Sequence, residues 1–154
     1  MTIYFFLTVL FDVCLLVTVV VGWRYGGASE RWGAAIVGVG SLVTFVLMGS
    51  SLFDWRTHRI GLIAIDAAAL VALVILMLRS TRFWPIWATA FHLIALCSHG
   101  VIYVLPRALL QTYAIFQGFW IYPIMACIVG GALSHRAATI RHDRAATKYD
   151  APPT

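Results

Sequence analysis

Five long apolar runs divide the chain, and short polar segments rich in arginine separate them. Each run has about 20 residues or more and lacks the alternation of polar and apolar positions expected of barrel strands. The runs cover residues 2–23, 32–53, 60–78, 83–105 and 108–133. As a helix that rises about 1.5 Å per residue, each can cross about 30 Å of hydrocarbon. The pattern predicts an all-α fold: a polytopic transmembrane helix bundle with five spans, in one domain of residues 1–134.

Lysine and arginine are unevenly shared between the two ends of such a bundle. With five spans, the first loop, the third loop and the tail lie on one side and hold Arg24, Arg31, Arg79, Arg82, Arg136, Arg141, Arg144 and Lys148. The second and fourth loops hold Arg56, Arg59 and Arg107. Because loops rich in lysine and arginine stay in the cytoplasm, we predict an outside N-terminus and an inside C-terminus. Residues 135–154 then form a basic cytoplasmic tail that extends the last helix for a turn or two and is partly disordered.

Composition narrows the class of protein further. The chain has 154 residues, of which 62% are hydrophobic and 11% charged, and this excludes a water-soluble globule, a disordered chain or a disulfide scaffold. The net charge of +5 lies between the runs and in the tail, which favours contacts with the lipid bilayer over nucleic acid. Cys14, Cys97 and Cys127 fall in three different runs, without the spacing of metal ligands.

Ionisable side chains inside a bilayer are costly and are functional candidates by default. Together with two further polar residues of the runs, they form a candidate intramembrane polar site of Asp12, Asp66, His92, His99, Tyr103 and Gln117. Asp12 and His92 lie at one depth, about 14–17 Å from the cytoplasmic helix ends. Asp66 and His99 lie at a second depth, about 18–24 Å from those ends. Two carboxylate–imidazole pairs are therefore geometrically possible. They would act as a proton relay or ligand cavity, or as interhelical hydrogen bonds that fix packing.

Small residues at helical spacing indicate close helix packing. In the fourth run, Ala88 and Ala95 share one face with the two histidines and Tyr103. The predicted packing seam consists of Gly38, Ser41, Ala88, Ala95, Gly118, Ala126 and Gly130. Pro123 lacks an N–H and favours a kink in the fifth run.

The sequence favours no enzyme and no cofactor. It contains no phosphate-binding loop and no catalytic motif, so we assign no catalytic residues. His92 and His99 are about 10.5 Å apart along a helix, too far to bind one iron together, and no other run contains a histidine. We therefore expect neither a haem nor a bound metal.

Two segments carry a resemblance to a known group of proteins. With its Trp55-Arg56-Thr57-His58-Arg59 hairpin and the stretch at 83–105, the chain resembles small, uncharacterised polytopic inner-membrane proteins of proteobacteria. The resemblance implies a multi-pass protein of the bacterial cytoplasmic membrane and no particular activity.

These observations lead to three hypotheses about function. The first is an accessory or scaffold membrane protein that binds a second copy or a larger membrane complex through helix–helix contacts. The second is a small proton-coupled carrier or channel that uses the intramembrane aspartates and histidines. The third is a haem-binding redox subunit.

Overall fold

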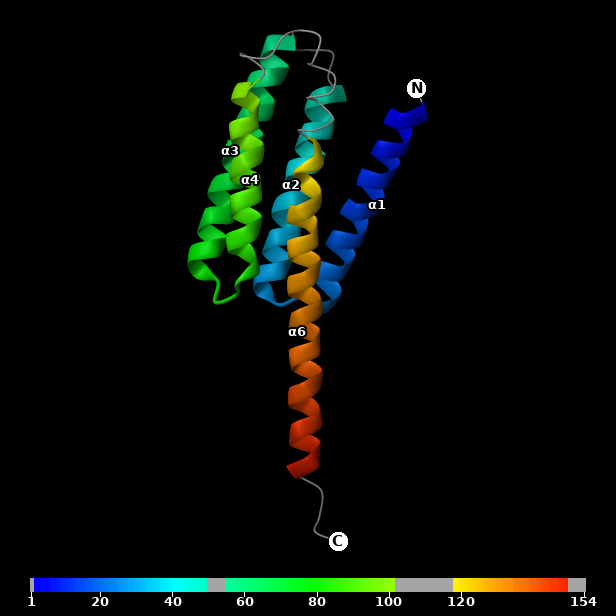
Figure 1. Ribbon diagram of the computed structural model, residues 1–154, viewed down its shortest axis with the longest axis vertical. Coiled ribbons are helices and arrows are strands. Elements are labelled where there is room, and N and C mark those ends of the chain that lie inside the picture. Colours follow the sequence, from blue (N-terminus) through cyan, green and yellow to red (C-terminus); the bar gives the residue numbers. More distant parts are fainter. Residues whose placement is uncertain (1, 50–54, 102–117, 150–154) are drawn as a thin grey trace.

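The computed structural model describes residues 2–49, 55–101 and 118–149, and these residues form helices joined by short connections. The helices are α1 (Thr2–Tyr25), α2 (Ala28–Gly49), α3 (Trp55–Arg79), α4 (Trp84–Val101) and α6 (Ile121–Tyr149). Successive helices run in opposite directions, so the α1–α2 and α3–α4 connections lie at the same end of the bundle, called the base here (Figure 1). Helix α6 passes the base and extends well beyond it (Figure 1).

The helices form a closed ring of contacts. Helix α1 packs on α2, α2 on α3, α3 on α4, α4 on α6, and α6 on α1. Helix α2 also contacts α6 across the ring. Helices α1 and α2 approach closely at Gly22, where an added Cβ would lie 2.9 Å from the Ala34 Cβ. The ring order decides which of the intramembrane polar residues can meet.

Three of the described helices are long and apolar enough to cross a membrane. The matching segments are Phe5–Tyr25, Ala28–Gly49 and Ile60–Arg79. Their outer faces carry large exposed apolar side chains, such as Phe5, Phe45 and Leu78. An apolar outer surface of this extent suits contact with lipid.

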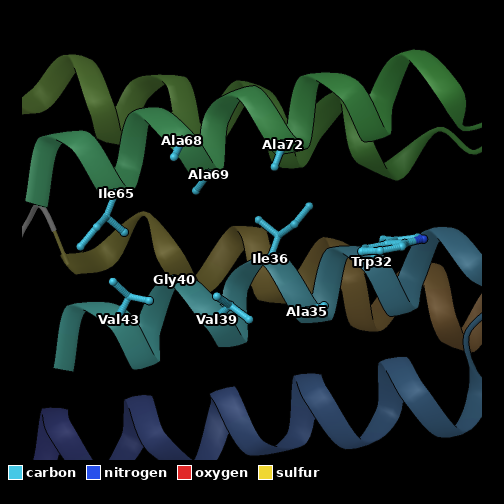
Figure 2. A pocket seen from close by; sticks show the side chains of 10 residues that line it. All are labelled: Trp32, Ala35, Ile36, Val39, Gly40, Val43, Ile65, Ala68, Ala69 and Ala72. Atoms are coloured by element: carbon cyan, nitrogen blue, oxygen red, sulfur yellow. The ribbon is translucent and has the colours of Figure 1, made fainter. Parts of the chain in front are cut away.

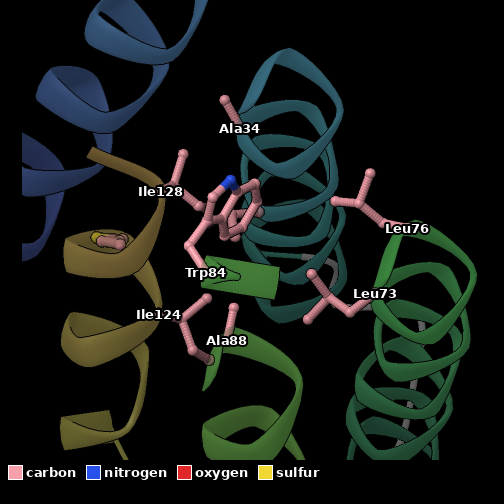
Figure 3. Close-up of a cluster of buried hydrophobic side chains, with 9 residues drawn as sticks. Ala34, Leu73, Leu76, Trp84, Ala88, Ile124 and Ile128 are labelled. Carbon is pink, nitrogen blue, oxygen red and sulfur yellow. The ribbon is translucent and has the colours of Figure 1, made fainter. Parts of the chain in front are cut away.

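The core lies where Trp84 of α4 enters the space between α2 and α6 (Figure 3). The core cluster consists of Ala34, Val37, Leu73, Leu76, Trp84, Ala88, Ile124, Met125 and Ile128. It draws on α2, α3, α4 and α6, while partly buried Phe11, Cys14 and Leu15 pack against it from α1. The bundle is therefore organised around one tryptophan near the base.

Two helix starts differ most from the sequence-based expectation. Helix α3 begins at Trp55, so the polar stretch through Arg59 belongs to its first turns and not to a hairpin loop. The run at 108–133 is not one uninterrupted helix, because the chain turns at Trp120 and α6 begins at Ile121. Pro123 then lies in the first turn of α6, where its missing N–H leaves no hydrogen bond unmade. The kink expected at this proline is therefore a helix start.

The tail is helical for much longer than one or two turns. Helix α6 continues through the polar segment to Tyr149, and the side chains from Arg141 to Thr147 are exposed. Alanines and arginines are strong helix formers and support this extension. Residues 150–154 lie outside the described part of the chain.

Candidate functional site

Asp66 of α3 is bound by both histidines of α4. The His92 Nε2 donates to the Asp66 backbone carbonyl over 2.9 Å. The His99 Nε2 lies 2.7 Å from the Asp66 Oδ2. Because a carbonyl oxygen can only accept, the His92 ring carries its proton on Nε2. We call these three residues the Asp66 cluster.

The Asp66 cluster fastens α3 to α4 within the apolar part of the bundle. His92 is buried, whereas the side chains of His99 and Asp66 are 16% and 33% exposed. The seven-residue spacing of the histidines places both on the face of α4 that meets α3. The close carboxylate–imidazole contact can hold the helices together and can also exchange a proton. Asp66 and His99, expected at one depth, are therefore brought together.

Asp12 does not take part in this arrangement. The pairing of Asp12 with His92 is wrong, because His92 is bound to Asp66 and the Asp12 side chain is exposed on α1. Its neighbours Val9 and Val13 are exposed as well. No residue of the described ranges forms a hydrogen bond or ion pair with the side chain of Asp12. Tyr103 and Gln117, the other candidates, lie outside the described residues.

The predicted packing seam is divided between the interior and the surface. Ala88 is fully buried in the core, and Ala95 and Ser41 are half-buried. A Cβ added to Gly38 would lie 3.5 Å from Val19 on α1. Ala88 and Gly38 therefore lie where helices pack against each other.

Gly118, which precedes α6, and Ala126 and Gly130 on α6 do not form the predicted seam within the described bundle. Ala126 and Gly130 are exposed, and a Cβ added to Gly118 or Gly130 would meet no described neighbour within 4 Å. Helix α6 packs instead through the adjacent face, which includes Ile128 and Gly131. Helix α6 is rotated so that Ala126 and Gly130 point away from the described bundle.

Glu30 is a buried carboxylate near the base that the sequence analysis did not single out. Its exposure is 1%. The Trp84 Nε1–H donates to Oε1 over 2.9 Å, and the Gly27 backbone N–H donates to Oε2 over 2.9 Å. Helix α2 begins at Ala28, so Gly27 is its N-cap and Glu30 reaches back as the third helical residue of a capping box. A negative charge at this helix start also suits the helix dipole.

Two glycines make room for the Trp84 ring. A Cβ on Gly33 of α2 would lie 2.5 Å from the ring atom Cη2. A Cβ on Gly131 of α6 would lie 2.5 Å from Cδ1 on the other part of the ring. Any larger residue at either position would push the indole away from Glu30. Helices α2, α4 and α6 therefore meet at this one side chain.

His135 of α6 completes the polar group at the base. The Arg82 Nη2 donates to the His135 Nδ1 over 2.6 Å. Because a guanidinium can only donate, this Nδ1 carries no proton. A Cβ on Gly27 would lie 3.2 Å from both the His135 Nε2 and the Glu30 Oε2, so the ring and the carboxylate approach the same glycine. We call Glu30, Arg82, Trp84 and His135 the base cluster.

The base cluster joins both base connections to α6. Arg136, next to His135, places its guanidinium 4.1 Å from the centre of the Tyr25 ring, which adds a cation–π contact to the end of α1. By the boundaries expected from the sequence, Glu30 falls in the first loop and His135 in the tail. The usable signal was the spacing of Glu30 after Gly27, which is that of a capping box.

The contacts within the Asp66 cluster and the base cluster join neighbouring helices. Within the described residues, no group of three or more His, Cys, Asp or Glu side chains could hold a metal ion. The Nε2 atoms of His92 and His99 are both engaged by Asp66, so an iron bound at either Nε2 would have to displace that contact.

No family model, curated protein or solved structure matches the chain.

Proposed function

We propose that this is an integral membrane accessory or scaffold protein that binds another membrane helix through the outer face of α1. The observation that carries the proposal is the exposed carboxyl of Asp12. It lies seven residues after the start of the apolar segment Phe5–Tyr25, among exposed apolar side chains. A carboxyl at the centre of a membrane helix costs about 2.5–3.5 kcal/mol, and such groups almost always face protein or water. A partner helix that hydrogen-bonds to Asp12 removes this cost.

The other buried polar groups favour the same function. Asp66 and Glu30 both have hydrogen-bond partners within the chain and hold neighbouring helices together. They serve the bundle itself, whereas Asp12 is left for a contact outside it. The partner is a second copy of this chain or a subunit of a larger membrane complex.

A proton-coupled carrier or channel is the second candidate, because the pair of Asp66 and His99 is partly exposed and can exchange a proton. The groove between α2 and α3, however, is lined by apolar residues and does not include this pair. Proton flux into vesicles containing the purified protein would favour the carrier. A haem-binding redox subunit would instead be recognised by a strong Soret absorption band.

We further propose that five helices cross a bacterial cytoplasmic membrane, with the N-terminus outside and the base in the cytoplasm. Support comes from the arginines at the base, namely Arg24, Arg31, Arg79, Arg82 and Arg136. Lysine and arginine near helix ends are retained on the cytoplasmic side.

Reporter fusions test this orientation. We expect fusions after Arg82 and Arg144 to report the cytoplasm, and a fusion after Arg59 to report the external side. A cytoplasmic signal after Arg59 would contradict the five-span arrangement. It would leave the proposal for Asp12 intact, since that residue lies in the first apolar segment in either case.

Photo-cross-linking in native membranes tests the proposed contact. A photoreactive amino acid at Val13 or Leu16, which are exposed on α1, is expected to give a protein adduct. Leu78 on α3 is also apolar and is more exposed than either, so it serves as the control, which should yield no protein adduct. An adduct of twice the chain mass indicates a second copy, and any other defined mass indicates a different subunit. Equal labelling from α1 and α3, or none from α1, would contradict the proposal.

A further inference from the structure

An apolar groove runs along the outer side of the bundle between α2 and α3 (Figure 2). It has a volume of about 380 Å³. Small residues on the two helices leave it open, in particular Ala35, Gly40, Ala68, Ala69 and Ala72. The rest of its walls are formed by the indole of Trp32 and by the branched side chains of isoleucines and valines. The groove is therefore long, narrow and without polar side chains that could bind a polar ligand.

The length and place of the groove match one leaflet of a bilayer. Its α2 wall extends from Trp32 to Val43, and eleven residues of helix span about 16 Å. This is about half of the 30 Å thickness of the hydrocarbon. Trp32 lies at the end nearer the base, and Val43 and Ile65 lie at the other end (Figure 2). A single acyl chain of the leaflet on the base side has this length and direction.

The end of the groove near the base is polar and positively charged. Arg79 follows Ala72 by seven residues and so lies two turns further along the same face of α3. It is exposed, and no residue of the described ranges forms an ion pair or hydrogen bond with its side chain. Next to Arg79, the hydroxyl of Ser80 lies 3.0 Å from the hydroxyl of Ser29. Ser29 is at the start of α2, and Ser80 directly follows the end of α3. Trp32 is 65% exposed, as a side chain at the membrane interface would be.

The charge at this end indicates an anionic headgroup. Arg24 and Arg31 are exposed at the base as well, whereas the carboxylate of Glu30 is buried and already hydrogen-bonded. A free guanidinium binds a phosphate through charge-assisted hydrogen bonds. An apolar slot of one-leaflet length that ends at an unpaired arginine is complementary to a phospholipid.

We propose that the groove between α2 and α3 binds one acyl chain of an anionic phospholipid, whose phosphate is held by Arg79. This site is separate from the outer face of α1 and does not depend on the function proposed for that face. The bound lipid fills the groove and covers the small residues that would otherwise leave α2 and α3 loosely packed. A charged lipid at the base also anchors α3 at a defined depth.

Native mass spectrometry of the purified full-length protein tests the proposal. The probes are phosphatidylglycerol and phosphatidylcholine with identical chains. We expect wild type to prefer phosphatidylglycerol, and Arg79→Gln to weaken that binding about fivefold, the effect of about 1 kcal/mol for one arginine near anionic lipid. Arg24→Gln is the control, because Arg24 is exposed at the base but lies on α1, which does not line the groove. Its effect should be under about twofold.

A second variant tests the chain-binding part. Ala68 is exposed at the outer edge of the groove, so Ala68→Phe should place a ring across it without disturbing the contact of α2 with α3. We expect Ala68→Phe to lose most binding of both lipids, and Ala68→Leu to lose part of it. Equal losses in Arg79→Gln and Arg24→Gln would overturn the proposal, as would unchanged lipid binding in Ala68→Phe. A wild-type dimer that Ala68→Phe converts to monomer would show that a second copy occupies the groove and would also overturn it.

Discussion

Replacing Trp84 with alanine is expected to destabilise the bundle by about 3–5 kcal/mol, the cost typical of removing a large buried aromatic side chain. Trp84 is 8% exposed and lies at the centre of the core cluster (Figure 3). Inside a membrane, helices are held together by van der Waals packing more than by the exclusion of water. The substitution would leave a cavity between Gly33 and Gly131 and remove most of that packing, because neither glycine has a side chain to fill the space.

The same substitution removes a hydrogen bond from a buried charge. The indole of Trp84 donates to Glu30, whose carboxylate is 1% exposed and cannot turn to solvent. A buried group that loses its partner costs about 1–3 kcal/mol. We therefore expect Glu30→Ala to be destabilising by itself. The double variant should be less destabilised than the sum of the two single variants, because they share one contact.

Trp87 provides a matched control for this prediction. It lies on the same helix, less than one turn further on, and is 55% exposed. Trp87→Ala is expected to change the free energy of unfolding by less than about 1 kcal/mol. Unfolding of each variant in mixed detergent micelles, followed by circular dichroism, measures the difference. Equal destabilisation by the two alanine substitutions would contradict the central role of Trp84.

The sequence predicted the positions of most helices because the length of an apolar run reports directly on burial in lipid. The runs at 2–23 and 83–105 begin within one residue of α1 and α4. The start of α2 was placed too late, because Ser29 and Glu30 were interpreted as loop residues. Polar residues at a helix start can instead cap the backbone. The spacing of three residues from Gly27 to Glu30 is what distinguishes a cap from a loop here.

Which helices touch could not be predicted, and the candidate polar site depended on it. Depth along the membrane normal allowed Asp66 to meet His99, and α3 does pack on α4. Depth also allowed Asp12 to meet His92, but α1 packs on α2 and α6 and the Asp12 side chain is exposed. When nearly every position of a helix is apolar, the hydrophobic pattern does not show which face of the helix points toward its neighbours. For the same reason, the outward rotation of Ala126 and Gly130 was not foreseen.

Replacing Asp12 with leucine is expected to separate the protein from its membrane partner while leaving its own fold intact. The Asp12 side chain forms no hydrogen bond or ion pair within the described bundle, so its loss removes no such contact between α1 and α2 or α6. Leucine at this depth also removes the cost of an exposed carboxyl in lipid, about 2.5–3.5 kcal/mol. The isolated variant should therefore unfold at the same detergent concentration as wild type, or at a higher one.

Asp12→Asn is the matched control for the hydrogen bond. Asparagine keeps the size of the side chain and a carbonyl oxygen that can accept from a partner, but it has no negative charge. We expect this variant to keep most of the association if the partner donates a hydrogen bond. Loss of association in both variants would indicate that the partner presents a cation.

The most direct test of the account is the mass of the complex extracted from native membranes under mild conditions, compared between wild type and Asp12→Leu. We expect wild type to be larger than the 17.0 kDa of a single chain, and Asp12→Leu to fall to the mass of one chain. The two proteins should show the same helical circular dichroism spectrum. A wild type that is already a single chain, or an Asp12→Leu variant that keeps the full mass of the complex, would contradict the proposal that α1 binds a membrane partner through Asp12.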